Sequence, residues 1–124
     1  MEAASKIKVV ERYVEAFANS DMNIIRDMFA DHAIVEDPVG SPVHEGIDAI
    51  CTFYDGALKS GANLTLTGKP CCAGNAVAFA FEVTMPGMHI DIIDVFEFDE
   101  QGKVNSMKAY WGPESVSQST PGAL

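Results

Sequence analysis

Residues 76–98 read AVAFAFEVTMPGMHIDIIDVFEF, and their alternating pattern decides the fold. Successive residues of a strand point to opposite faces of a sheet, so a half-buried strand shows a period of two. The period predicts a strand from Ala76 to Met85, a tight turn at Pro86-Gly87 and a second strand that carries Asp94. Together they form a β-hairpin with one strongly apolar face, made of Val77, Phe79, Phe81, Val83, Met85, Ile90, Ile92, Phe96 and Phe98.

Asp94 is the exception on this apolar face. Burying an unpaired charge is costly, and a buried carboxyl group usually takes up a proton instead. A neutral carboxylic acid donates a hydrogen bond and can therefore stabilise an oxyanion that develops in a reaction. The structural alternative is a twist or bulge that carries Asp94 to solvent or to a buried partner.

Three helices are predicted ahead of the hairpin. Apolar residues recur at helical spacing over about residues 3–18, 24–29 and 46–58. Further strands are predicted at residues 33–36, 64–67 and 103–111. Helices first and antiparallel strands afterwards are typical of an α+β fold in which the helices pack on one face of a sheet.

The chain of 124 residues is long enough for one domain with a hydrophobic core. We expect a single domain over residues 1–115. Residues 116–124 are rich in Ser, Pro and Gly, so we expect a flexible tail there.

The charge balance is strongly acidic, with 18 Asp and Glu against 8 Lys and Arg and a net charge of −10. A surface of this sign argues against nucleic acid and anionic membrane as partners. The N-terminal residues lack the apolar stretch of an export signal, and the longest apolar run, Ala76 to Phe81, is too short to cross a bilayer. We therefore expect a cytoplasmic protein.

Neither a metal nor an organic cofactor is indicated. The three cysteines, Cys51, Cys71 and Cys72, form no C-x-x-C pair, and His32, His44 and His89 show no metal-ligand spacing. Nucleophile elbows, dinucleotide-binding glycines and phosphate-binding loops are also absent from the sequence.

Asp37 and Tyr13 are the other candidate catalytic residues. Asp37 ends a short predicted strand, has the same parity as Val35 and precedes a Pro-Val-Gly turn that lets its side chain project over a cavity mouth. Asp-Pro is also an ordinary way to begin a turn. Tyr13 lies on the apolar stripe of the first helix, where a tyrosine is often simply core and Tyr54 is available to bind its hydroxyl.

These residue types suit one reaction class, the abstraction of a proton next to a carbonyl group. An ionised Asp37 would move the proton, while Tyr13 and a neutral Asp94 would hold the oxygen that becomes negative. We expect the apolar walls of the pocket to come from Phe17, Phe81, Val83, Met85, Ile90 and Met107.

Four segments resemble the bacterial Δ5-3-ketosteroid isomerases of the nuclear-transport-factor-2-like superfamily. They are residues 11–15 (ERYVE), 35–40 (VEDPVG), 92–100 (IIDVFEFDE) and 107–111 (MKAYW). The resemblance runs from about residue 5 to 115. It implies a cone-shaped fold, in which three N-terminal helices pack on a curved, mainly antiparallel sheet that encloses an apolar pocket.

The resemblance also implies a role for each matching residue. Asp37 matches the general base, Tyr13 the oxyanion-hole tyrosine and Asp94 the protonated aspartic acid of that family. Tyr54 matches a tyrosine that supports the oxyanion-hole tyrosine, and Trp111 matches a tryptophan whose ring nitrogen orients the base.

The implied activity is conversion of a 3-oxo-Δ5-steroid to the conjugated 3-oxo-Δ4-steroid by a homodimer that pairs through the outer face of the sheet. Phe29 stands where some members carry another tyrosine of the hydrogen-bond network, and we expect this departure to shorten the network without removing catalysis. Two other departures bear on the steroid preferred: Phe17 is bulkier than the aliphatic residue of some members, and the turn at residues 86–88 is short against some members.

Two other classes stay open from the sequence. Another enzyme of the cone fold, of the polyketide cyclase or epoxide hydrolase type, could reuse Asp37 as its base. A non-catalytic module that binds a small ligand or a protein would make Asp37 and Asp94 structural.

Overall fold

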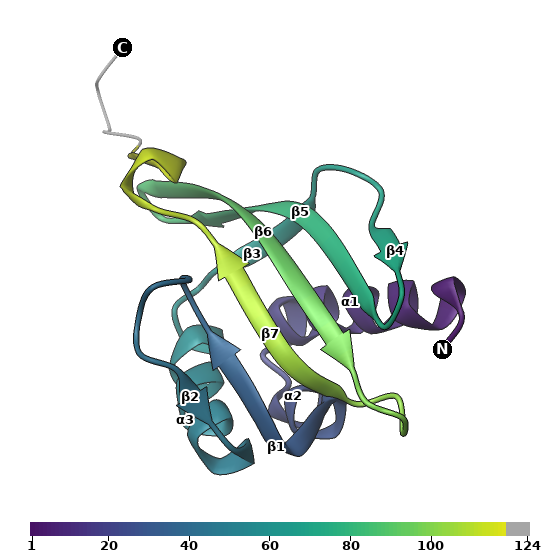
Figure 1. The fold of residues 1–124 in the computed structure, drawn as a ribbon. Coiled ribbons are helices and arrows are strands. Elements are labelled where there is room, and N and C mark those ends of the chain that lie inside the picture. Colours follow the sequence, from purple (N-terminus) through teal and green to yellow (C-terminus); the bar gives the residue numbers. More distant parts are fainter. Residues whose placement is uncertain (119–124) are drawn as a thin grey trace.

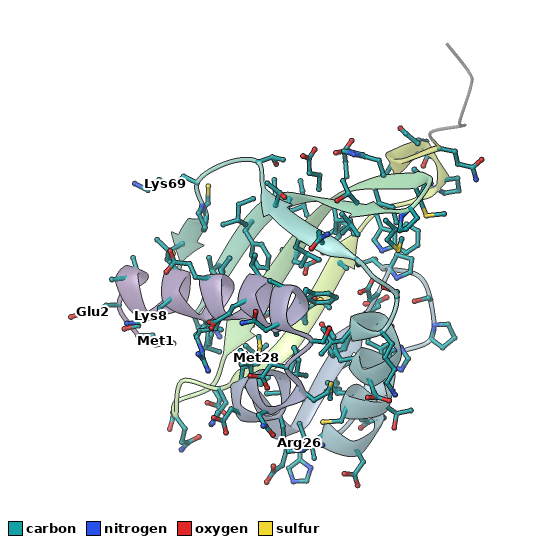
Figure 2. All side chains as sticks on the ribbon, turned by 180° about the vertical axis from the view of Figure 1, so that it is seen from behind. Met1, Glu2, Lys8, Arg26, Met28 and Lys69 are labelled. Carbon is teal, nitrogen blue, oxygen red and sulfur yellow. The ribbon has the colours of Figure 1, made fainter. Side chains whose placement is uncertain are left out.

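The computed structural model of the chain describes residues 1–118 and confirms the α+β class. Three helices, α1 (Ala3–Asn19), α2 (Met22–Met28) and α3 (Ile47–Leu58), lie on one side of a twisted sheet (Figure 1). Seen from the opposite side, the helices lie in front of the strands (Figure 2). None of the helices in this part of the chain is long and apolar enough to span a membrane.

The sheet has eight strands and is mainly antiparallel, as expected. Its main path runs β2-β1-β7-β6-β5-β3, with β4 paired to β5 and β8 paired to β6. The one parallel pair joins β1 to β7. The strands are β1 (Phe29–Glu36), β2 (His44–Glu45), β3 (Asn63–Leu66), β4 (Cys71–Ala73), β5 (Ala76–Met85), β6 (Met88–Phe98), β7 (Val104–Tyr110) and β8 (Val116–Gln118).

The core lies between the helices and the inner face of the sheet. The predicted hairpin is confirmed, with β5 over the predicted residues and the register Phe79 to Asp94 and Val83 to Ile90. On α1 the buried stripe includes Val10, Tyr13 and Ala16. Because α1 contacts β3, β4 and β5 while α3 contacts β1 and β2, the two helices cover different parts of the same face.

Two predicted elements need correction. Phe29 begins β1 instead of ending the second helix, because its backbone is extended and it pairs with Val104 of β7. Residues 116–118 do not form a loose tail: they make β8, in which Val116 pairs with Ile90 of β6. The rest of the predicted tail, residues 119–124, lies outside the described residues.

Candidate active site

Asp94 lies in the middle of β6, opposite Phe79 of β5 and Ala109 of β7. Its predicted place on the apolar face is confirmed: the residue is 1% exposed, and neither carboxyl oxygen has a partner at hydrogen-bonding distance. Burial raises the pKa of Asp94 well above its ordinary value of 3.8, and the negative charge of Asp37 raises it further, although the nearby Tyr13 hydroxyl opposes the shift. The surroundings of Asp94 therefore favour its neutral form, which has a proton to donate.

Tyr13 and Tyr54 come together at the same place. Their hydroxyl oxygens are 3.0 Å apart, and both residues are buried. Edge-on aromatic contacts with Phe79 and Phe96 hold the Tyr13 ring in position. Burial is the main reason that the pKa of each tyrosine lies well above 10.0. When Tyr54 donates to the Tyr13 oxygen, the Tyr13 proton is free to point at a ligand.

Asp37 follows β1 directly, where the parallel pairing of β1 with β7 brings it to the end of β7. The indole Nε1 of Trp111 donates a hydrogen bond of 2.8 Å to Asp37 Oδ1. Partial burial raises the pKa of Asp37 from 3.8, while the Trp111 hydrogen bond and the nearby His44 lower it. The hydrogen bond from Trp111 therefore orients the Asp37 carboxyl group through Oδ1. It leaves Oδ2 free of Trp111, and a free carboxylate oxygen suits a proton acceptor.

One cavity of about 210 Å³ collects all five of these side chains. Most of its polar groups belong to Tyr13, Asp37, Tyr54, Asp94 and Trp111, and Ser60 adds a hydroxyl. The remaining walls are apolar and consist of Phe17, Phe53, Ala57, Ala62, Leu64, Phe81, Val83, Met85, Ile90 and Ile92. A small set of polar groups in an apolar cavity is typical of sites for small neutral ligands.

Met107 is the predicted wall residue that does not line this cavity. It is fully buried and pairs with Phe96, and it lies two residues before Ala109, which pairs with Asp94. Met107 therefore has the predicted face but lies in the packed core beyond the cavity.

Several cavity residues were not predicted. Phe53 and Ala57 both line the cavity, and their spacing of four along α3 places them on one side of the helix. That spacing is visible in the sequence, but the apolar stripe containing Tyr54 dominates the pattern. Ile92 has the parity of Asp94 and lines the cavity beside it.

Comparison with known proteins supports an enzyme of the cone fold. Residues 10–107 match the SnoaL-like domain family. A steroid Δ-isomerase of Nocardioides simplex is 35% identical over 108 residues, which cover 84% of this chain and 87% of that protein. The chain belongs to the SnoaL-like family within the nuclear-transport-factor-2-like superfamily. The resemblance of this family member to the ketosteroid isomerases is thereby confirmed.

A solved structure of the same fold extends the comparison. The epoxide hydrolase/cyclase-like enzyme SalBIII, which has a role in pyran ring formation in the polyether salinomycin, superposes with a TM-score of 0.88. It is 25% identical, and the match covers 95% of this chain and 98% of that one. Both relatives are enzymes with different chemistry, so the family alone does not select a reaction.

A first prediction concerns the stability cost of Asp94. The folded chain keeps a proton on Asp94 that the unfolded chain releases near pH 3.8, so the free energy of unfolding falls as the pH rises above that value toward the raised pKa. Asp94→Leu removes the titratable group that causes this fall in the free energy of unfolding, and it also removes the two unpaired buried oxygens. The cavity beside position 94 accepts the larger leucine side chain. We expect denaturant unfolding near neutral pH to show a gain of about 1–3 kcal/mol.

The gain from Asp94→Leu should shrink as the pH approaches 3.8. The control is Asp31→Leu, which replaces an exposed aspartate of β1. An Asp94→Leu protein that is no more stable than the parent at neutral pH would show that Asp94 is not held as an unpaired neutral acid.

Proposed function

We propose that the chain is a steroid Δ-isomerase, which converts 3-oxo-Δ5-steroids into 3-oxo-Δ4-steroids. The observation that carries this proposal is the presence of one oriented carboxylate, Asp37, in the same apolar cavity as two neutral donors, Tyr13 and Asp94. The similarity to the steroid Δ-isomerase of Nocardioides simplex supports the choice of substrate class.

In this reaction Asp37 removes a proton from C4 of the steroid. The electrons of the C4–H bond move toward the C3 carbonyl and form a dienolate, whose oxygen accepts hydrogen bonds from Tyr13 and Asp94. Asp37 then returns the proton to C6, so the double bond moves into conjugation and the base is regenerated. Every step uses groups of this chain, and the scheme requires neither a metal nor an organic cofactor.

The electrostatics of the cavity favour opposite protonation states for its two carboxyl groups. Asp94 is almost completely buried, whereas Asp37 is half-buried and keeps its hydrogen bond to Trp111. The negative charge on Asp37 is itself one of the causes that raise the pKa of Asp94. An ionised base and a neutral acid can therefore exist together at neutral pH.

The apolar walls complete the proposed steroid site. Phe17, Phe81, Val83, Met85 and Ile90 were predicted as walls, and all five line the cavity. Transfer of the apolar surface of a tetracyclic steroid from water to these walls favours binding. The bound steroid is thereby held with C4 and C6 beside the base.

Homodimer formation through the outer face of the sheet is part of the same proposal. Ile34, Ile93 and Tyr110 are large apolar residues that are 41%, 49% and 47% exposed, and they lie on neighbouring strands of that face. The cytoplasmic location expected from the sequence also belongs to the proposal.

The test is the ultraviolet absorbance of a 3-oxo-Δ5-steroid after the purified chain is added without any cofactor. Rapid growth of the conjugated-enone band is the expected result. A steroid that binds without conversion would favour another reaction on this fold, and a steroid that neither binds nor reacts would favour a binding module for a different ligand.

An epoxide hydrolase/cyclase-like reaction is the second candidate, because the structural likeness to SalBIII covers almost the whole chain. In that reaction Asp37 could still serve as the base, but the paired donors Tyr13 and Asp94 would have no clear task. Consumption of an epoxide substrate with no action on Δ5-steroids would favour this candidate.

The role of Trp111 gives a second prediction, on pH dependence. Its hydrogen bond lowers the pKa of Asp37, so Trp111→Phe should raise that pKa. Because the base acts in its ionised form, the acidic limb of the kcat/KM profile should move to higher pH. At the pH optimum, Trp111→Phe should lose less kcat/KM than removal of the general base would, which costs about 10²–10⁴-fold.

The profile is measured with the steroid assay, and Tyr110→Phe, which alters an exposed neighbouring ring, is the control. An acidic limb that moves to lower pH, or that does not move, would contradict the orienting role of Trp111.

A further inference from the structure

A second group of titratable side chains lies on the outer face of the β5–β6 hairpin. His89 and Asp91 are two residues apart on β6 and point to the same side, and Glu82 of β5 pairs directly with Asp91. One potential ligand atom from each residue lies within 4.8 Å of the other two. These three residues are the outer triad.

The distances in the outer triad fit the coordination shell of a metal ion. The Nε2 atom of His89 lies 2.9 Å from Asp91 Oδ1 and 3.5 Å from Glu82 Oε2. Zinc bonds of about 2.0–2.1 Å at tetrahedral angles place neighbouring ligand atoms about 3.3 Å apart. The two separations lie on either side of that value, so small side-chain rotations suffice to place a metal between the three atoms.

Charge and access also favour a cation. Within residues 1–118, neither Glu82 nor Asp91 forms a salt bridge with a lysine or an arginine, so only His89, when it is protonated, offsets their negative charges. The side chains of His89, Glu82 and Asp91 are 35%, 36% and 71% exposed, so water can fill the remaining coordination position. The net charge of −10 further raises the local concentration of cations.

We propose that Glu82, His89 and Asp91 bind one divalent transition-metal ion of the zinc class. The imidazole selects this class over calcium and magnesium, which prefer shells made only of oxygen. The ion takes the place of the proton that the His89 ring shares with Asp91. The site is separate from the cavity and does not depend on the proposed isomerase activity.

Metal at the outer triad would join β5 to β6 behind the cavity wall. Val83 follows Glu82, Ile90 lies between His89 and Asp91, and both line the cavity from the opposite face of the hairpin. Because the ligands lie on two paired strands, bound metal should slow amide hydrogen exchange in this hairpin.

The experiment is a calorimetric titration of the full chain with zinc at about pH 8, where imidazole is free to ligate. The variants are His89→Ala, Glu82→Gln and Asp91→Asn, and His32→Ala is the matched control because it removes another exposed histidine. Since Cys71 is exposed and Cys72 is adjacent, the titration is repeated with Cys71→Ser and Cys72→Ser combined. Calcium replaces zinc in a further run, and circular dichroism verifies that each variant is folded.

We expect one zinc ion per chain. Each triad variant should weaken binding by at least about tenfold, since even outer-shell partners of a metal contribute about 10- to 100-fold to affinity. His32→Ala and the double cysteine variant should bind as the parent does. Absence of zinc binding, binding that survives all three triad variants, binding that disappears with the cysteines, or equal binding of calcium would each overturn the proposal.

Discussion

Asp37→Asn should lower kcat for steroid isomerisation by about 10²–10⁴-fold, the usual contribution of a general base, and should leave steroid binding largely intact. The amide cannot accept the C4 proton. It keeps the size of the carboxylate and an oxygen that can still accept the hydrogen bond from Trp111, so the cavity retains its shape. Stopped-flow absorbance measures kcat, and equilibrium titration with a product steroid measures binding.

The oxyanion donors should remain in place in this variant. Loss of the Asp37 charge removes one cause of the raised pKa of Asp94, but burial, the larger cause, remains. A phenolic steroid, whose oxygen carries part of the negative charge of a dienolate, should therefore bind Asp37→Asn at least as tightly as the parent. The matched control is Glu36→Gln, which changes the adjacent carboxylate that accepts a hydrogen bond from Gly40 N. Turnover by Asp37→Asn at the parental rate would assign the proton transfer to another group.

Removing one oxyanion donor should produce the second-largest loss. Asp94→Leu and Tyr13→Phe should each reduce kcat by about 10²–10³-fold, because each eliminates a hydrogen bond that strengthens as charge develops on the steroid oxygen. Asp94→Asn should cost less than Asp94→Leu, because an amide still donates a hydrogen bond. The same absorbance assay with a single Δ5-steroid measures these reductions in kcat.

Tyr54→Phe is the matched comparison for Tyr13→Phe. It removes a hydroxyl that lies 3.0 Å from the Tyr13 oxygen, so its loss should weaken the network without deleting a donor to the steroid. The expected order of activity is Tyr54→Phe above Tyr13→Phe. A fully active Asp94→Leu protein would show that Asp94 does not contact the developing oxyanion.

The buried position of Asp94 was predictable because a strand has a fixed period. Once Ile90, Ile92, Phe96 and Phe98 are assigned to the inner face, Asp94 must share it, and the register with β5 agrees. The same argument from strand period wrongly assigned Met107 to the cavity wall. Parity gives the face of a strand, whereas the distance of a residue from the cavity depends on packing between elements that are far apart in the chain.

The contact between Trp111 and Asp37 shows a second limit of the sequence. The two residues are 74 positions apart, and they meet because β1 pairs in parallel with β7 in a register that places Val35 opposite Met107. Local periodicity contains no information on that pairing, and only the family resemblance predicted the contact. The three-residue strands β4 and β8 were missed because they are too short to show a period.

The outer triad was missed for a related reason. His89 and Asp91 have the spacing of two that places both on one face of a strand, and this spacing is readable in the sequence. The third residue, Glu82, joins them only through the hairpin register. A metal-ligand pattern that crosses between strands therefore has no local motif.

The most direct measurement of the proposed mechanism follows a deuterium label from C4 of a 3-oxo-Δ5-steroid in ordinary water, with mass spectrometry and nuclear magnetic resonance of the product. If Asp37 performs both proton transfers inside the apolar cavity, the conjugated product should carry deuterium at C6, and Asp37→Asn should form almost none of this product. Product with no deuterium at C6 would contradict transfer by a single sheltered base, and the absence of any isomerised product would contradict the proposed function itself.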